Sequence, residues 1–180
     1  MQVGWFVLVI ALLGMAVTFF YAKSKFNWTH EVVLGIGAGP LPVLMGMYAT
    51  TVAPPWVDGL IVSVPFAIVA AFAGLALDEY PDAEANLKKG VKSIAYKVWE
   101  SGVALEWYLS SWFLFMFVYQ VFLITIGLLA PLSAIAFILW PFLLAAMVFL
   151  RTNFQKASNA IIILGVLYPA LMVLGQALGR

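Results

Sequence analysis

Long apolar stretches alternate with short polar segments along the whole chain. Six of these stretches approach the roughly 20 residues that an α-helix needs to cross the hydrocarbon core of a bilayer. They are Val3–Ala22, Val32–Val52, Trp56–Leu77, Leu105–Leu129, Leu132–Leu150 and Ala160–Leu178. The pattern therefore predicts an all-α integral membrane protein with six transmembrane helices in a single domain, residues 1–180, and a polar cap segment at about 79–103.

The composition supports this class and excludes others. Of the 180 residues, 65% are hydrophobic and 9% are charged, and the mean hydropathy is +1.06; a soluble domain is roughly 45–50% apolar. The net charge is only +1 and the bases lie in short loops, so we expect no nucleic-acid partner. The absence of cysteine excludes disulfides and thiolate metal sites, which leaves oxygen ligands for any metal.

Lysine and arginine residues follow alternate spans. Eight of the nine come after the first, third and fifth spans, and they are Lys23, Lys25, Lys88, Lys89, Lys92, Lys97, Arg151 and Lys156. Because cytoplasmic loops carry an excess of these residues, we expect all three loops to face the cytoplasm. The sequence thus predicts an integral protein of the cytoplasmic (plasma) membrane, with both chain ends outside.

The second span contains features that predict an irregular helix. Gly35 and Gly39 form a small-xxx-small pair, which favours close helix packing. Pro40 and Pro42 interrupt helical hydrogen bonding, and a broken helix is tolerated in a membrane only beside protein or a water-filled cavity. We therefore expect a bend bordering a cavity, lined by Gly39, Pro40 and Tyr48; for Tyr48, packing or interfacial anchoring explains the position equally well.

His30 is the only histidine and immediately precedes the second span. One interpretation is a proton shuttle or a metal ligand. The other, which we favour at this stage, is a solvated side chain at the membrane interface.

Charge gathers in one place, directly after the third span. The residues concerned are Asp78, Glu79, Asp82, Glu84, Lys88, Lys89 and Lys92. Asp78, Asp82 and Asn86 recur at intervals of four, a spacing that places side chains on one helix face, although Pro81 is expected to bend the chain between the two aspartates. Carboxylate and amide oxygens suit Mg²⁺, which is commonly held by one or two carboxylates plus substrate phosphates.

Lys88 and Lys92 are also four residues apart and can neutralise phosphate oxygens. Together with the acids, they predict a site for a lipid diphosphate at the end of an apolar helix. The alternative is an ordinary solvated loop, in which the acids pair with the lysines and the remaining bases meet anionic lipid.

The chain resembles a known family in two motifs. Residues 39–48 read GPLPVLMGMY, and one span later residues 78–86 read DEYPDAEAN, followed by GVKS at 90–93. In this order they resemble the UbiA superfamily of intramembrane prenyltransferases, most of all its 1,4-dihydroxy-2-naphthoate polyprenyltransferase branch. The resemblance implies a bundle of nine transmembrane helices around a central cavity, with two Asp-rich motifs that bind a prenyl diphosphate through Mg²⁺.

The second of those motifs is altered in this chain. It usually reads N-x-x-x-D-x-x-x-D; here Asp82 matches directly, Asp78 stands at the Asn position and Asn86 at the final Asp position. Val91 replaces a Lys of the trailing motif, which leaves Lys88 and Lys92 to contact diphosphate. The resemblance therefore implies Asp78 and Asp82 as catalytic residues, and Asp78, Asp82 and Asn86 as metal ligands.

The six spans resemble the family's fourth to ninth helices. The resemblance then implies that three helices, with the first Asp-rich motif, are absent, so that the chain is a truncated frame, half of a split enzyme or a degenerate relative. A separate chain carrying the first motif is an implied partner. The expected function is transfer of a polyprenyl group from a prenyl diphosphate to an aromatic acceptor such as a naphthoate or benzoate, as in quinone (menaquinone) biosynthesis. The alternative is a non-catalytic, isoprenoid-binding or subunit-type membrane protein.

Overall fold

The computed structural model of the chain describes residues 5–26, 29–50 and 55–179. Within these ranges the regular structure is helical and no β-strand is present. The chain packs as two compact units, residues 1–103 and residues 104–180, and each is described by itself. The prediction of a single domain stays a prediction.

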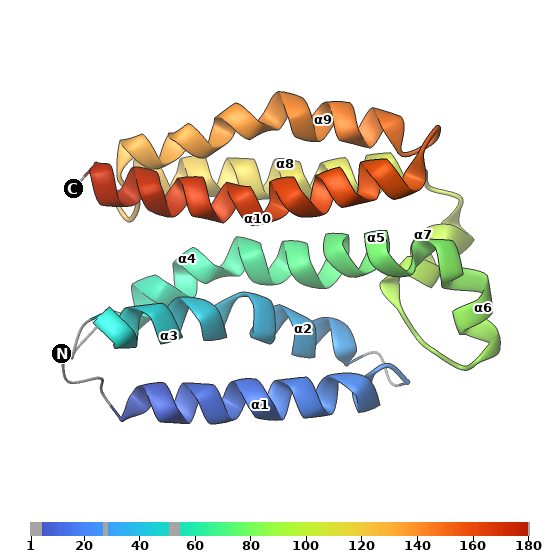
Figure 1. Cartoon of the computed structure of the whole chain (residues 1–180), viewed down its shortest axis with the longest axis horizontal. Coiled ribbons are helices and arrows are strands. Elements are labelled where there is room, and N and C mark those ends of the chain that lie inside the picture. The colour runs from blue at the N-terminus through green and yellow to red at the C-terminus, as the bar shows by residue number, and fades with distance from the viewer. Residues whose placement is uncertain (1–4, 27–28, 51–54, 180) are drawn as a thin grey trace. The chain divides into compact units, whose positions relative to one another are not determined.

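Unit 1 contains a bundle of apolar helices followed by short polar ones (Figure 1). Its elements are α1 (Phe6–Ser24), α2 (His30–Ala38), α3 (Pro40–Thr50), α4 (Trp56–Ile68), the π-helical turn η1 (Val69–Gly74), α5 (Leu75–Glu79), the 3-10 turn η2 (Tyr80–Asp82), α6 (Ala83–Lys88) and α7 (Ile94–Ser101). The pair α2–α3 lies between α1 on one side and α4–η1 on the other. Helix α7 packs on α5, η2 and α6 at the end of the bundle where α1 ends and α2 begins.

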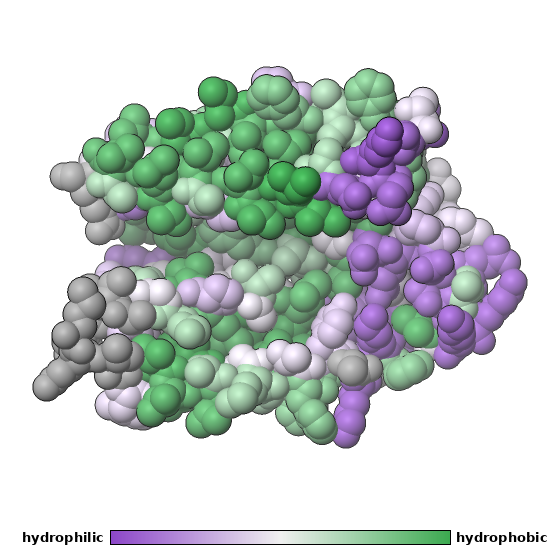
Figure 2. All heavy atoms as spheres, in the orientation of Figure 1, coloured by the Kyte–Doolittle hydropathy of each residue, from purple (hydrophilic) through white to green (hydrophobic). Residues whose placement is uncertain are grey.

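The segment Trp56–Lys88 is one continuous helical rod of 33 residues. Its backbone changes from α-helix to a π-turn, back to α-helix and then to a 3-10 turn before α6. Most of the rod is apolar, but its last part, from α5 to α6, carries four of its acidic residues, Asp78, Glu79, Asp82 and Glu84. In Figure 2 the hydrophilic residues of unit 1 gather over this end, near α6 and α7.

Unit 2 is built from apolar helices. Its elements are α8 (Leu105–Thr125), the 3-10 helix η3 (Pro131–Leu139), α9 (Trp140–Phe149) and α10 (Phe154–Leu178). Helix α10 packs along η3 and α9, and α8 contacts both of these as well. The closest approach is at Gly175 of α10, where an added Cβ would come within 2.6 Å of Leu132 C and Ser133 Cα.

Five helices in the described part of the chain are long and apolar enough to cross a membrane. They are His30–Tyr48, Trp56–Lys88, Leu105–Thr125, Pro131–Phe149 and Phe154–Leu178. Many of their apolar side chains face outward: Val148 is 72% exposed and Val166 is 66% exposed. Large exposed apolar surface of this extent is what a lipid-facing surface requires. The prediction of an all-α membrane protein is therefore supported at this coarse level.

The first predicted span differs from the other five. Its apolar part, Phe6–Tyr21, is a helix shorter than the five above. The outer ends of the predicted spans at Val3 and Val52 lie outside the described residues. The count of six transmembrane helices stays a prediction.

The predicted break in the second span is present at Gly39, between α2 and α3. The residue is buried, and a Cβ there would come within 2.6 Å of the Ala67 side chain and 2.8 Å of its backbone. Gly35, one turn earlier, faces Ala67 and Ala71 in the same way, at 3.1 and 3.4 Å. The prediction that these two glycines permit close helix packing is confirmed.

Candidate functional site

The predicted acidic ligands lie on the polar end of the rod. Asp78 is in α5 and Asp82 ends η2, and both side chains are exposed. The 3-10 turn between them winds more tightly than an α-helix, so the four-residue spacing does not preserve one α-helical face. Among the described residues, neither carboxylate forms a hydrogen bond or ion pair. Asn86, in α6, is half-buried.

The two candidate diphosphate lysines have different surroundings. Lys88 Nζ lies 2.7 Å from Glu84 Oε1 in an exposed pair on α6. Lys92 is exposed at the end of the following loop, and its backbone N–H donates to the carbonyl oxygen of Lys25 at 3.0 Å. An exposed pair of this kind contributes little, so Lys88 can exchange Glu84 for another anion at small cost.

The donor chemistry of Asp78, Asp82 and Asn86 suits Mg²⁺, but these residues do not form a protein-only metal cage. Within the described ranges, no group of three His, Asp or Glu residues is arranged to hold a metal ion. Two carboxylates with an amide are nevertheless enough for Mg²⁺ when phosphate oxygens and water complete its coordination. The residues therefore fit the metal only together with a phosphorylated ligand.

The predicted cavity-lining residues are packed against protein. Gly39 faces Ala67, Pro40 begins α3, and the half-buried ring of Tyr48 stacks on Phe6 with 5.2 Å between centroids. A surface hollow of about 240 Å³ does occur near the polar end of unit 1. It is lined by Phe20, Lys23, Ser24, Thr29 and Val33, none of which belongs to the predicted site.

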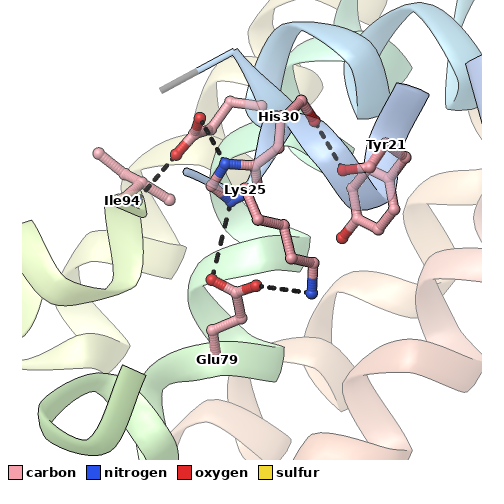
Figure 3. Close-up of polar contacts among 7 residues, drawn as sticks. Tyr21, Lys25, His30, Glu79 and Ile94 are labelled. Atoms are coloured by element: carbon pink, nitrogen blue, oxygen red, sulfur yellow. Dashed lines mark hydrogen bonds and ion pairs between the residues drawn. The ribbon is translucent and has the colours of Figure 1, made fainter. Parts of the chain in front are cut away.

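A charged cluster, formed by the half-buried Lys25 and the buried His30, Glu31 and Glu79, lies beside the acidic segment (Figure 3). His30 begins α2 and its side chain is fully buried, so the interpretation of a solvated histidine is wrong. Its Nδ1 lies 3.3 Å from Glu31 Oε2, and its Nε2 lies 3.8 Å from Glu79 Oε2. Lys25 Nζ, at the end of α1, lies 3.4 Å from the other oxygen of Glu79.

The cluster also caps a helix. The backbone N–H of Ile94, the first residue of α7, donates to Glu31 Oε1 at 2.9 Å. A carboxylate at this position satisfies an otherwise unpaired N–H and complements the positive end of the helix dipole. Glu31 thus links the start of α2 to the start of α7, across 63 residues of sequence.

Several polar atoms of the cluster have no well-formed hydrogen bond. They are both ring nitrogens of His30, Oε2 of Glu31 and Oε2 of Glu79. The two ring nitrogens face different carboxylates, so the three side chains do not converge on one point where a metal could sit. The arrangement instead places the buried ring between two carboxylates, one from its own helix and one from α5.

Sequence reasoning named Glu79 only as one acid of the charged segment and missed the cluster. The available signal was weak: His30 and Glu31 are adjacent ionisable residues at the start of an apolar stretch, and Glu79 follows another. Side-chain contacts between residues far apart in sequence bring them together. Compared with models of known protein families, with curated proteins and with solved structures, the chain gives no significant match, so the likeness to the UbiA superfamily stays a prediction.

Proposed function

We propose that the chain is a membrane prenyltransferase of the UbiA type, or its C-terminal part, that binds the diphosphate group of a prenyl diphosphate at Asp78, Asp82 and Asn86. The observation that carries the proposal is the pair of exposed carboxylates, Asp78 and Asp82, without hydrogen bonds or ion pairs among the described residues. They follow an apolar helix long enough to lie along an isoprenoid chain. Acids in this setting are a functional-site hypothesis by default.

Mg²⁺, when bound, would neutralise charge on the diphosphate. Asp78 and Asp82 would supply its carboxylate ligands and Asn86 an amide oxygen. Lys88 and Lys92 would contact the diphosphate oxygens directly. In the reaction that the resemblance implies, the carbon–oxygen bond to diphosphate breaks, the freed prenyl carbon bonds to the aromatic ring, and that ring carbon loses its proton.

The alternative is a non-catalytic protein that binds an isoprenoid lipid or serves as a subunit. It is favoured by one observation: in the described part of the chain, the acidic segment lacks a third carboxylate or histidine arranged around a metal. A site so open holds a ligand more readily than it stabilises the charge of a transition state.

Binding can be tested with the purified full chain and farnesyl diphosphate as the probe. We expect a Mg²⁺-dependent rise in Tm, which the variant Asp82→Asn abolishes. Glu100→Gln is the matched control, because Glu100 is an exposed acid of the same cap segment outside the proposed site. Absence of a Mg²⁺-dependent shift in the unmodified chain would overturn the proposed site.

Catalysis needs a separate measurement. With 1,4-dihydroxy-2-naphthoate and farnesyl diphosphate, formation of a prenylated product that disappears in Asp82→Asn would support the enzyme. Binding without product by the chain alone, and product on addition of a chain carrying the first Asp-rich motif, would support a split enzyme. Binding without product in either case would support the non-catalytic alternative.

A further inference from the structure

The surface hollow where α1 ends and α2 begins is separate from the proposed diphosphate site. Phe20, Lys23 and Ser24 border it from α1, and Thr29 and Val33 border it from the start of α2. Its volume is about 240 Å³. At about 30 Å³ for each water molecule of the liquid, this is room for a phosphate with a few carbon atoms, but not for a long prenyl chain.

The hollow is polar at one end and apolar at the other. Phe20 belongs to the apolar part of α1, whereas Lys23 and Ser24 lie one turn farther on, where the helix ends. Thr29 immediately precedes α2, and Val33 lies one turn into the apolar span that follows. Both helices therefore place their polar side chains at the outer end and their apolar ones toward the membrane. This distribution suits an amphiphile at the membrane interface.

Lys23 supplies the positive charge of the hollow. Its side chain is exposed, and its Nζ lies over the ring of Phe19, 4.8 Å from the centroid. Among the described residues no acid forms an ion pair with it, whereas Lys25, two residues later, is paired with Glu79. An ammonium group has three donors, so the contact with an exposed ring leaves it able to bind an anion. The described side chains around the hollow include no acid that would compete.

Hydroxyl groups give the hollow a second kind of contact. Ser24 Oγ donates to the carbonyl oxygen of Tyr21 at 2.7 Å, so its oxygen can still accept a hydrogen bond. The side chain of Thr29 does not cap α2. An acceptor and a cation in the same hollow match a phosphate diester whose alcohol still carries a hydroxyl group, as in phosphatidylglycerol.

The hollow does not continue as a tunnel between the two helices. One turn deeper the helices meet, because a Cβ at Gly37 would come within 2.9 Å of Val17 Cγ1. In the same stretches of the two helices, other apolar side chains face outward, namely Phe19, Val32 and Ile36. The hydrocarbon chains of a ligand would therefore lie on the outer surface, in contact with the bilayer. This arrangement suits a bilayer lipid more than a substrate enclosed by protein.

We propose that the hollow binds the headgroup of an anionic phospholipid, with the phosphate at Lys23 and the hydroxylated alcohol at Ser24 and Thr29. One lysine matches the single charge of a phosphate diester. A prenyl diphosphate would need acidic residues to hold a metal ion against its larger charge, and the described side chains around the hollow include none. The proposal does not rest on the proposed function, whose ligands are other residues.

The absence of cysteine allows a single reporter thiol to be placed in the hollow. Thr29→Cys places it there, and Lys89→Cys, at an exposed residue that does not border the hollow, is the matched control. With the full chain in detergent, dioleoylphosphatidylglycerol at about four times its Kd should slow maleimide labelling of Thr29→Cys roughly fivefold. The zwitterionic dioleoylphosphatidylcholine should not. Equal slowing by both lipids, or equal slowing in the control, would overturn the proposal.

Charge variants in the Thr29→Cys background test the role of Lys23. Lys23→Gln should weaken the affinity for dioleoylphosphatidylglycerol roughly fivefold, the effect of one lysine beside an anionic lipid, whereas Lys23→Arg should keep it. Lys89→Gln removes the same charge from another exposed position and should leave the affinity unchanged. Equal weakening by Lys23→Gln and Lys89→Gln would mean that overall charge holds the lipid, which would refute the site.

Competition separates the lipid from other phosphates. Glycerophosphoglycerol, the same headgroup without acyl chains, should not restore labelling; if it did, the occupant would be a soluble phosphate and the proposal would fail. Displacement of the lipid by farnesyl diphosphate, dependent on Lys23 and not on Asp82, would move the diphosphate site to the hollow and overturn both proposals. Failure of farnesyl diphosphate to bind at all, with the lipid results as expected, would sink the proposed function alone.

Discussion

The buried cluster around His30 in unit 1 is charged and lies at helix ends, whereas a second polar cluster, around Gln120 in unit 2, is neutral and lies within its helices. Gln120 Nε2 donates to the carbonyl oxygen of Ser133 at 2.9 Å, and the hydroxyl of Tyr168 donates to Gln120 Oε1. Gln120 and Tyr168 are both buried. One amide therefore both donates and accepts, without any ionised group.

The difference indicates what each part of a membrane-spanning chain tolerates. A neutral amide whose hydrogen bonds are made can lie at membrane depth at modest cost. A group of charges is tolerated near a helix end, where water and polar backbone are close. The neutral cluster should therefore hold its helices together independently of pH, whereas the charged one should be weakened most by the loss of one charged or polar member.

The largest expected effect is that of His30→Ala. Removing the ring leaves the buried carboxylate of Glu79 with Lys25 alone and that of Glu31 with the Ile94 N–H alone, so the free energy of unfolding of unit 1 should fall by about 3–5 kcal/mol. Denaturant titration followed by the helical circular dichroism signal would measure it. Glu100→Ala, at an exposed ion pair, is the control. If His30→Ala lowered the free energy of unfolding as little as the control does, the charged cluster would not contribute more to stability than a surface pair.

A steric change in unit 2 should come next. In Gly175→Ala the added methyl group meets the backbone of Leu132 and Ser133, which cannot move as a side chain can. Overpacking of this kind costs roughly 1–3 kcal/mol. Gly165→Ala, in the same helix, is the control because a Cβ there meets nothing within 4 Å. Equal stability of the two variants in thermal unfolding would show that η3 and α10 do not pack so closely.

Gln120→Leu should have a smaller effect that does not depend on pH. It removes the partner of the Ser133 carbonyl and of the Tyr168 hydroxyl. Side-chain hydrogen bonds between transmembrane helices are worth about 0.6–2 kcal/mol. Unfolding at two pH values, with Tyr168→Phe as the second arm of a cycle, would measure it. If the loss of stability depended on pH, the cluster around Gln120 would not behave as a neutral one.

The smallest effect is expected for Glu84→Gln. Glu84 and Lys88 form an exposed ion pair one helical turn apart on α6. Because such pairs are screened by water and salt, the variant should unfold at the same temperature as the unmodified chain. If its Tm instead fell as far as that of Gln120→Leu, the surface charges of α6 would contribute as much to stability as the buried hydrogen bonds of unit 2.

Local sequence pattern was sufficient for the helices and for part of their packing. Five long apolar helices and the break at Gly39 follow from runs of apolar residues and from proline chemistry, which act over a few residues. The exposure of Asp78 and Asp82 also follows from their position after an apolar run. The 3-10 turn at Tyr80–Asp82 was foreseen only as a bend.

Burial of charge could not be predicted in the same way. Glu79 directly follows Asp78 in the sequence, yet the side chain of Glu79 is buried and that of Asp78 is exposed. Glu79 lies against Lys25 and His30, and its contact with Lys25 joins residues 54 positions apart. The residue pattern of a single segment carries no information about partners so far away in the sequence. The interpretation of His30 as solvated was therefore wrong because tertiary packing buries the side chain.

The π-turn Val69–Gly74 has a consequence for insertions and deletions in the rod. A π-turn holds one more residue than an α-turn, so it absorbs an extra residue without changing which way the following helix faces. Loss of one residue between Val69 and Gly74 should therefore straighten the rod and still leave Glu79 facing His30. The same deletion within Trp56–Ile68 would rotate all later residues about the helix axis by roughly 100° relative to those before it. Helix α5 would then no longer present Glu79 to His30.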